Sequence, residues 1–211
     1  MKDWFRSVTR SVRWKLIRIL SPSTWDKSQK STCPQSVIPR GSTLNAIRHF
    51  GNKPITVCEI GVNKAENTVN IMGLLNITHA YLIDFYEEYT YFFQDKSYRI
   101  SQEEQKKAFG EAQRNLEPFR DRITWILKSS DKAVNDLPEN VDFIYIDGNH
   151  AYESVKRDME LYWQKVADKG ILAGHDFFGT YNGVIKAVHE FAMKHGLQIS
   201  SDLYDWWFIK T

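Results

Sequence analysis

The sequence has little cysteine and no long apolar run. Only two of its 211 residues are cysteine, Cys33 and Cys58, and they form no C-x-x-C pair. Such sparse cysteine argues against a disulfide framework or a zinc ribbon and fits a reducing compartment, so we expect a cytoplasmic protein. Because no run of about 18 apolar residues occurs, we expect no segment to span a membrane.

Net charge is also small, but it is unevenly placed. The formal net charge is +2 at pH 7. Residues 1–20 hold six basic groups and one acid, whereas the remaining residues hold 22 basic and 25 acidic groups, so the two parts carry +5 and −3. The acidic body makes nucleic acid an unexpected partner, because the basic stretch is confined to the beginning of the sequence.

Residues 3–20 have the spacing of a basic amphipathic helix. Its apolar positions are Phe5, Val8, Val12, Leu16 and Ile19. Three interpretations are open: peripheral contact with an anionic membrane surface, packing on its own domain or a second copy of the chain, and a cleaved transit peptide. Pro22 ends the pattern, so we divide the sequence into a helix (1–20), a linker (21–41) and one domain (42–211).

From Ser42 onward, short apolar runs alternate with helical patterns. We expect Ser42 to cap a first helix that Gly51 ends, and Ser101-x-x-Glu104 to open another as a capping box. Strands are predicted at 55–60, 80–84, 123–127, 141–146 and 170–174, and helices at 66–75, over the 3, 4 spacing from Tyr152 to Val166, and from Val184 to Gly196. This alternation predicts an α/β fold with a Rossmann-like, doubly wound parallel sheet.

The end of the sequence departs from that alternation. Residues 197–200 and 204–209 predict a hairpin that adds one antiparallel strand, with Trp206 and Trp207 pointing to opposite faces. The aromatic segment 86–93 has two interpretations: a lid over a bound ligand, or an insertion packed on the sheet.

In an open parallel sheet, ligands bind beyond the carboxyl ends of the strands. The first strand ends in Glu59-Ile60-Gly61-Val62-Asn63, where glycine permits close approach of a ligand to the backbone. The second strand ends in Asp84, which is placed to accept hydrogen bonds from ribose hydroxyls. The later glycines of a G-x-G-x-x-G fingerprint are lacking, so a pyrophosphate cofactor is disfavoured.

E-x-G followed by a distant acid resembles the first motifs of class I S-adenosylmethionine (SAM)-dependent methyltransferases. The resemblance implies a seven-stranded sheet with an antiparallel strand from the last hairpin, and SAM as the cofactor. It implies that Glu59, Gly61, Asn63 and Asp84 bind SAM, together with Ser129 and Ser130, which follow the third strand where the family contacts adenine.

Two further segments, I-D-G-N-H at 146–150 and G-I-L-A-G-H-D at 170–176, resemble the small-molecule O-methyltransferase branch that includes macrocin, mycinamicin and catechol O-methyltransferases. In its metal-dependent members, the matching positions bind a divalent ion, here Asp147, His175 and Asp176. Magnesium prefers oxygen ligands, so a nitrogen ligand at His175 suits manganese, iron or zinc better, unless His175 binds substrate. His150 matches the catalytic base, with Asp147 beside it as a catalytic and cofactor-binding residue.

The sequence therefore predicts a SAM-dependent O-methyltransferase that acts on a small-molecule hydroxyl, with a sugar or glycan as the expected acceptor and Mg²⁺ or Mn²⁺ as the expected ion. One alternative is a nicotinamide-dependent sugar oxidoreductase, which the missing glycine fingerprint disfavours. Another is a non-catalytic Rossmann-like module tethered by the first helix, in which Asp147 and His150 cap a helix and Asp176 is a turn acid. Convergence of these three residues on one cavity would separate enzyme from module.

Overall fold

The computed structural model describes residues 39–93, 96–202 and 204–211. The predicted helix over 1–20, and the linker as far as residue 38, lie outside the described residues, so both stay predictions. Within the described part, no helix combines the length and the apolar character needed to cross a membrane.

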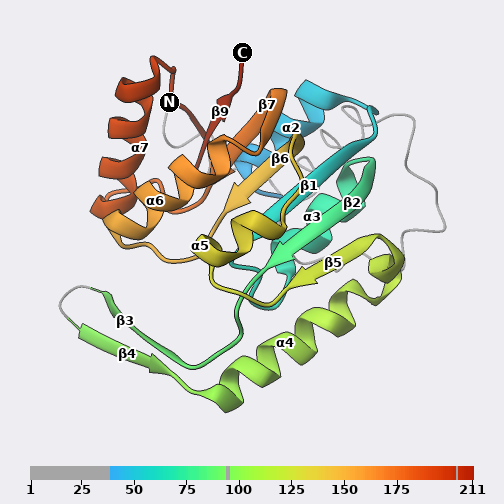
Figure 1. Cartoon of the computed structure of the whole chain (residues 1–211), viewed down its shortest axis with the longest axis vertical. Coiled ribbons are helices and arrows are strands. Elements are labelled where there is room, and N and C mark those ends of the chain that lie inside the picture. The colour runs from blue at the N-terminus through green and yellow to red at the C-terminus, as the bar shows by residue number, and fades with distance from the viewer. Residues whose placement is uncertain (1–38, 94–95, 203) are drawn as a thin grey trace, which may run out of the picture.

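Seven strands form one sheet in the order β5-β2-β1-β6-β7-β9-β8 (Figure 1). They are β1 (Ile55–Ile60), β2 (Ile77–Ile83), β5 (Ile123–Ile126), β6 (Val141–Ile146), β7 (Val166–Gly174), β8 (Ser200–Asp202) and β9 (Asp205–Ile209). Neighbouring strands from β5 to β7 are parallel, and β9 is antiparallel to both β7 and β8. The predicted doubly wound sheet with one antiparallel C-terminal strand is therefore confirmed.

Helices cover both faces of the sheet. The longer ones are α2 (Gly41–Phe50), α3 (Glu66–Leu74), α4 (Gln102–Leu116), α6 (Tyr152–Trp163) and α7 (Asn182–His195); the short ones are α5 (Ser130–Ala133), η2 (Glu117–Arg122) and η3 (Val134–Asp136). One apolar cluster joins α2, α3 and α4 to the sheet, and a second joins α5, α6 and α7 to the opposite face. Trp207 packs against the first cluster and Trp206 lies in the second, as strand alternation predicts.

Three local predictions are wrong in detail. Ser42 does not cap α2, because Arg40 is the N-cap residue and the Ser42 hydroxyl is bound by Asp205 instead. The helix that begins at Tyr152 ends at Trp163, and Val166 instead begins β7, where it pairs with Val141. Strand β2 begins at Ile77, earlier than the apolar run indicated. The capping box of Ser101 and Glu104 is confirmed.

The segment between β2 and α4 forms a separate hairpin of β3 (Tyr89–Phe93) and β4 (Lys96–Ile100). Figure 1 shows that it projects away from the seven-stranded sheet. Tyr86 packs as expected on Phe109 and is buried. Packing of the whole insertion on the sheet is wrong, because Tyr89 and Tyr98 are 38% and 39% exposed.

Candidate active site

The sheet order reverses between β1 and β6, since the chain leaves β1 toward β2 and β5, and returns at β6 to continue toward β7. Such a reversal opens a crevice beyond the carboxyl ends of the two central strands. The predicted site residues after β1, β2, β6 and β7 all lie along this edge of the sheet.

The loop after β1 approaches the loop after β6 very closely. A Cβ atom on Gly61 would collide with the carbonyl oxygen of Asp147, and Gly61 has a φ of +84°. Two later positions of the loop also have left-handed backbone, with φ of 49° at Asn63 and 63° at Ala65. The loop therefore follows a glycine-like path without the later glycines, with asparagine at a position it tolerates well.

Glu59 lies below this loop and is 2% exposed. It accepts a hydrogen bond from Asn67 at 3.0 Å and another from the Thr68 hydroxyl, both on α3. Burial raises the pKa of Glu59 to about 7, although these two hydrogen bonds and the charge of Arg40 act to lower it. Glu59 thus holds α3 against the loop and carries a carboxyl whose charge changes near neutral pH.

Asp84 lies beside the same loop at the end of β2. Its carboxylate accepts backbone hydrogen bonds from Asn63 at 2.9 Å and Tyr86 at 3.2 Å. Burial raises the pKa of Asp84, whereas these backbone donors lower it. Backbone hydrogen bonds from Val62 and Phe85 act in the same direction, so the carboxylate faces the backbone of both loops. Gly61, Asn63 and Asp84 therefore lie together at this edge of the sheet, and their binding of SAM stays a prediction.

Ser129 and Ser130 follow β5 on the far side of β2. The Ser130 hydroxyl donates to the buried Asp158 of α6 at 2.7 Å, and the Ser130 carbonyl accepts from Tyr162 at 2.8 Å. Ser130 therefore fastens α5 to α6, whereas Ser129 interacts locally with Asp131. Their contact with a cofactor stays a prediction.

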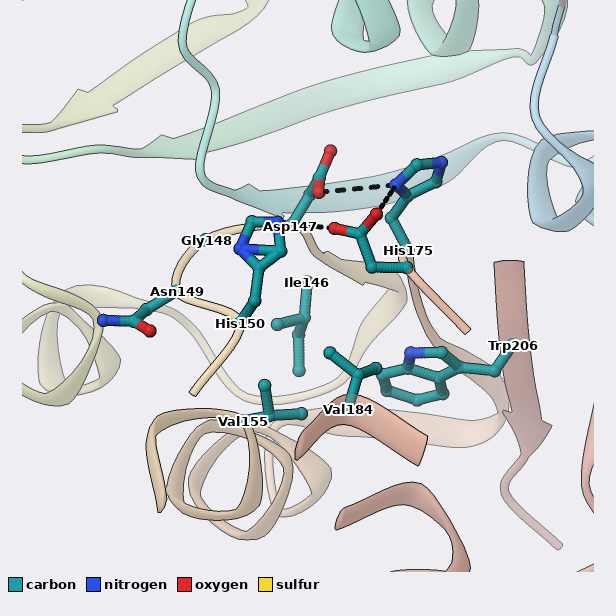
Figure 2. A pocket seen from close by; sticks show the side chains of 10 residues that line it. Ile146, Asp147, Gly148, Asn149, His150, Val155, His175, Val184 and Trp206 are labelled. Atoms are coloured by element: carbon teal, nitrogen blue, oxygen red, sulfur yellow. Dashed lines mark ion pairs between the residues drawn. The ribbon is translucent and has the colours of Figure 1, made fainter. Parts of the chain in front are cut away.

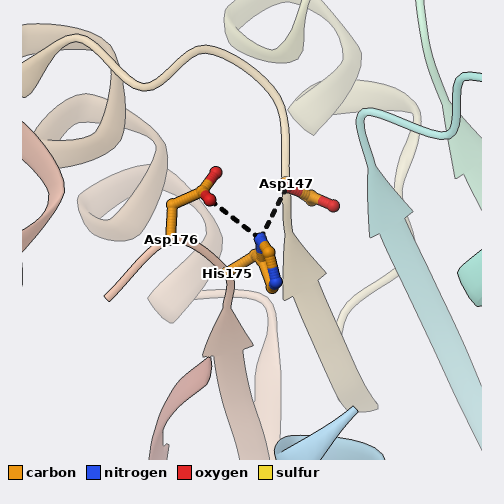
Figure 3. Close-up of side chains that lie close together, drawn as sticks. All are labelled: Asp147, His175 and Asp176. Carbon is orange, nitrogen blue, oxygen red and sulfur yellow. Dashed lines mark ion pairs between the residues drawn. The ribbon is translucent and has the colours of Figure 1, made fainter. Parts of the chain in front are cut away.

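Asp147, His175 and Asp176 form a compact cluster where β6 and β7 end (Figure 3). His175 Nδ1 lies 3.0 Å from Asp176 Oδ1 and 3.9 Å from Asp147 Oδ1. Asp176 is buried and has a φ of 60°, a strained conformation for a residue that is not glycine. Burial raises the pKa of Asp147, and the positive charge of Arg40 opposes that effect.

His150 comes to the same cluster from the loop before α6. Its Nε2 lies 2.5 Å from Asp176 Oδ2. Asp147, His150, His175 and Asp176 line one narrow cavity, and Figure 2 shows apolar side chains of Ile146, Val155, Val184 and Trp206 beneath them. The convergence that separates an enzyme from an interaction module is therefore present. Asn149 shapes the turn before α6, because its side-chain oxygen accepts a hydrogen bond from the backbone N–H of Ala151.

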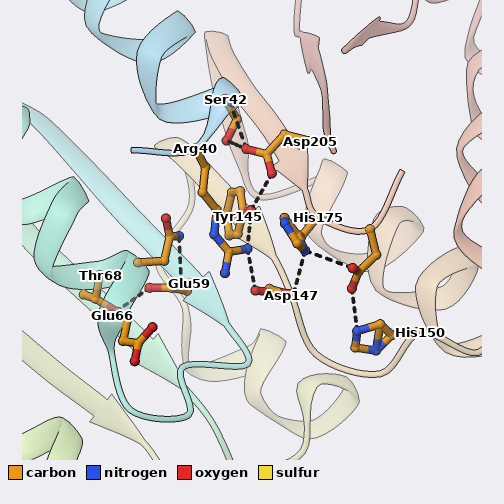
Figure 4. A network of polar contacts seen from close by, with 12 residues as sticks. Arg40, Ser42, Glu59, Glu66, Thr68, Tyr145, Asp147, His150, His175 and Asp205 are labelled. Atoms are coloured by element: carbon orange, nitrogen blue, oxygen red, sulfur yellow. Dashed lines mark hydrogen bonds and ion pairs between the residues drawn. The ribbon is translucent and has the colours of Figure 1, made fainter. Parts of the chain in front are cut away.

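Sequence reasoning missed a polar network that adjoins the cluster (Figure 4). Arg40 Nη1 donates to Asp147 Oδ2 at 2.6 Å and to the Tyr145 hydroxyl at 2.7 Å. The Tyr145 hydroxyl donates in turn to Asp205 at 2.8 Å, and Asp205 also accepts from the backbone of Ser42 at 2.9 Å. Arg40 lies in the stretch predicted to be a linker. The one sequence signal for its role is that a basic residue directly precedes the first predicted helix of the domain.

The cluster fits a divalent ion by its donor set. In each carboxylate, one oxygen contacts a residue that is not part of the three-residue cluster. Asp147 Oδ2 accepts from Arg40, and Asp176 Oδ2 is paired with His150. The other oxygen of each faces His175 Nδ1, so two oxygens and one nitrogen converge. Ligating carboxylates are typically held in this way by neighbouring groups, and a mixed N/O set suits manganese better than magnesium.

One sequence pattern points toward an oxidoreductase and was overlooked. Tyr152 and Lys156 have the Tyr-x-x-x-Lys spacing of a catalytic base pair. Here the Lys156 ammonium donates to the Tyr152 hydroxyl at 2.7 Å, and both contact Glu190 of α7. These contacts tie α6 to α7, so the pair has a structural use.

The sheet order and the family match below define a methyltransferase domain with a Rossmann-like fold. The family model described as "Methyltransferase domain" matches residues 58–177, which is more than half of the chain, and the chain therefore belongs to that family. No curated protein matches the sequence.

Solved structures with a similar fold include a protein described as a caffeoyl-CoA O-methyltransferase from Staphylococcus aureus (TM-score 0.60, 15% identity, covering 94% of this chain and 99% of that one). Another is described as a methyltransferase from Streptococcus mutans in complex with SAH (TM-score 0.58, 12% identity, covering 83% and 100%). A third is described as an rRNA methylase from Clostridium thermocellum (TM-score 0.57, 15% identity, covering 83% and 98%). At these identities, the likeness establishes the fold alone.

Proposed function

We propose that the protein is an O-methyltransferase that transfers the methyl group of SAM to a hydroxyl of a small molecule, with His150 as the general base. The observation that carries the proposal is the convergence of Asp147, His150, His175 and Asp176 on one cavity beside the Gly61 loop. A nicotinamide-dependent oxidoreductase and a non-catalytic module are both less consistent with this cluster and with the family.

We infer that SAM lies along the crevice, with separate groups of residues for its methionine end, its ribose and its adenine. The loop that Gly61 opens has left-handed backbone at Asn63 and Ala65 and leads into the N-terminus of α3, and Asp84 beside it would accept from ribose hydroxyls. We assign adenine to the region of Ser129 and Ser130, and the methionine end to the region between Glu59 and Asp147. SAM would supply a methyl group bound to a sulfonium sulfur: the acceptor hydroxyl oxygen would bond to the methyl carbon, the carbon–sulfur bond would break with its electron pair left on sulfur, and S-adenosylhomocysteine would leave as the hydroxyl proton passes to a base.

We assign the role of proton acceptor to His150. Asp176 Oδ2 is 2.5 Å from Nε2, so its negative charge favours a proton on Nε2 and leaves the Nδ1 lone pair available. The hydroxyl proton would pass to His150 Nδ1, and the imidazolium that results would be stabilised by Asp176. His150 itself is 39% exposed along its side chain, so the proton can afterwards be released to solvent.

A divalent ion, with manganese favoured over magnesium, is the second part of the proposal. Asp147, His175 and Asp176 would hold it through the three atoms that face one another. Bound there, it would lower the pKa of the acceptor hydroxyl. The test is Mn²⁺ binding by electron paramagnetic resonance: His175→Ala should lose the bound signal and His189→Ala, at an exposed position of α7, should keep it. Equal binding by both variants would contradict the assignment.

A sugar or glycan is the proposed acceptor because aromatic rings gather beside the base. Tyr181 lies 4.8 Å from the His150 ring, Phe178 lies 5.1 Å from Tyr181, and Tyr204 lies 4.7 Å from Phe178, measured between ring centroids. Tyr204 is 61% exposed, so this surface is open to a ligand. Aromatic faces of this kind pack well on the C–H face of a sugar ring.

The decisive measurement is calorimetry with SAM and with S-adenosylhomocysteine, with and without a chelator. Binding of either supports the methyltransferase, and binding of neither contradicts it. Transfer of a labelled methyl group should then be measured on simple glycosides and on catechols. Turnover that a chelator does not reduce would contradict the proposed role of the divalent ion. Turnover on catechols but not on glycosides would contradict the proposed sugar acceptor.

The amphipathic pattern of residues 3–20 supports a second proposal, peripheral membrane contact or self-association. Deletion of residues 1–20 should abolish binding to anionic liposomes and leave SAM affinity unchanged. Liposome binding that survives the deletion would refute membrane contact, and sedimentation of both forms at the same mass would refute self-association.

A further inference from the structure

Arg40 is a cation that lies between Glu59 and Asp147, beside the carboxyl ends of β1 and β6 (Figure 4). Its backbone carbonyl accepts from Leu44 at 3.0 Å and so anchors the residue at the start of α2. Its guanidinium lies over the ring of Tyr145, 5.4 Å from the centroid, and only Nη1 is used for the hydrogen bonds to Tyr145 and Asp147. The position of the charge is therefore set from two sides before any ligand binds.

Most of the donors of Arg40 remain unused. A guanidinium has five N–H donors in a rigid fork. Within the described residues, Nε and Nη2 have no hydrogen-bond partner, although the side chain is only 26% exposed. Donors left free in this way are open to an anionic ligand, with which a guanidinium fork makes strong charge-assisted hydrogen bonds.

The location of Arg40 identifies that anion. Figure 4 shows the guanidinium between Glu59 at the end of β1 and Asp147 at the end of β6. If ribose binds at Asp84 and adenine beyond it toward β5, the opposite end of SAM extends past Gly61 toward β6. The α-carboxylate is the sole anionic group of SAM and lies at that end. Lys64, the next cation along the loop, is paired with Glu111 at 3.2 Å.

We propose that Arg40 binds the α-carboxylate of SAM through the donors that Tyr145 and Asp147 leave free. The inference rests on the proposed function, and it adds to that function a cofactor-binding residue from the segment before α2. In this arrangement, Tyr145 and Asp205 are positioning residues, because they hold the guanidinium without touching the cofactor.

The test compares SAM with decarboxylated SAM, which lacks only this carboxylate, by calorimetry on the full chain. Wild-type protein should bind SAM about tenfold to a hundredfold more tightly, the loss expected for one charge-assisted contact. In Arg40→Gln that preference should disappear, mainly through weaker SAM binding, and Arg40→Lys should restore part of it. Lys53→Gln removes an ion pair with Asp142 at the start of β6 and should keep the wild-type preference.

The outcomes separate this inference from the proposed function. Failure of the wild-type protein to bind either compound would overturn the methyltransferase itself. Binding of both compounds with equal affinity would overturn only the role of Arg40. If Arg40→Gln binds both compounds more weakly by the same factor, Arg40 has a purely structural role, and the proposed contact with the carboxylate is overturned as well. If circular dichroism shows that Arg40→Gln does not fold, the wild-type protein and Arg40→Lys are compared instead. A preference for SAM over decarboxylated SAM that is smaller in Arg40→Lys than in wild type supports the role of Arg40, and an equal preference overturns it.

Discussion

Replacement of Glu59 by glutamine should make the stability of the protein depend less on pH. Glu59 is 2% exposed, and its pKa rises to about 7 in the folded protein from 4.5 in its ordinary state. The folded state therefore binds more protons than the unfolded state between these two values. This contribution to stability is fully present below pH 4.5 and is lost as pH rises through 7. Glutamine keeps the polar contacts with Asn67 and Thr68 but cannot ionise.

The size of the effect follows from the two pKa values. Between pH 5 and pH 8, the wild-type protein should lose about 2 to 3 kcal/mol of unfolding free energy relative to Glu59→Gln. The assay is urea unfolding of both proteins at several pH values, because titration of all other groups cancels in the difference. A difference that stays constant with pH, or one that favours wild type as pH rises, would refute the argument that burial controls this carboxyl.

Three other replacements test the site. Gly61→Ala should destabilise the protein by about 2 kcal/mol or more and abolish SAM binding, because the added Cβ would meet the Asp147 carbonyl. The control is Gly51→Ala, which also has a positive φ but open space around it and should cost only about 1 kcal/mol. Thermal unfolding measures the loss of stability in both variants. His150→Ala should lower kcat by about a hundredfold to ten thousandfold with SAM affinity unchanged, while His189→Ala should retain turnover. Asp205→Asn should cost about 1 to 3 kcal/mol in urea unfolding, since it disturbs three hydrogen bonds at a fully buried side chain, and an unchanged midpoint would contradict that accounting.

The site residues that follow strands could be predicted because the carboxyl ends of parallel strands meet at one edge. Glu59, Asp84, Asp147 and Asp176 each stand at or just after a short apolar run, so the fold alone brings them together. The glycine-like path of the loop after β1 was not predictable from its composition. The φ of 63° at Ala65 is a conformation that alanine disfavours and that the close contact between two loops imposes.

The β3–β4 hairpin could not be predicted for a related reason. Its residues have no clean alternation of apolar and polar side chains, because the hairpin does not lie on the core and neither face is buried by the sheet. The aromatic-rich run therefore left two interpretations open, a lid over a bound ligand and an insertion packed on the sheet. Tyr91 nevertheless lies within electrostatic range of the site, since it contributes after burial and Asp176 to the raised pKa of Tyr181.

Arg40 shows most clearly what a linear reading leaves out. Proline content predicted a linker over residues 21–41, which includes Arg40. In the structure, the Asp147 side chain is 17% exposed; burial raises its pKa, and Arg40 is the first group that offsets this effect. Arg40 comes from the segment before α2, so a residue predicted to lie in the linker takes part in the polar network of the candidate site.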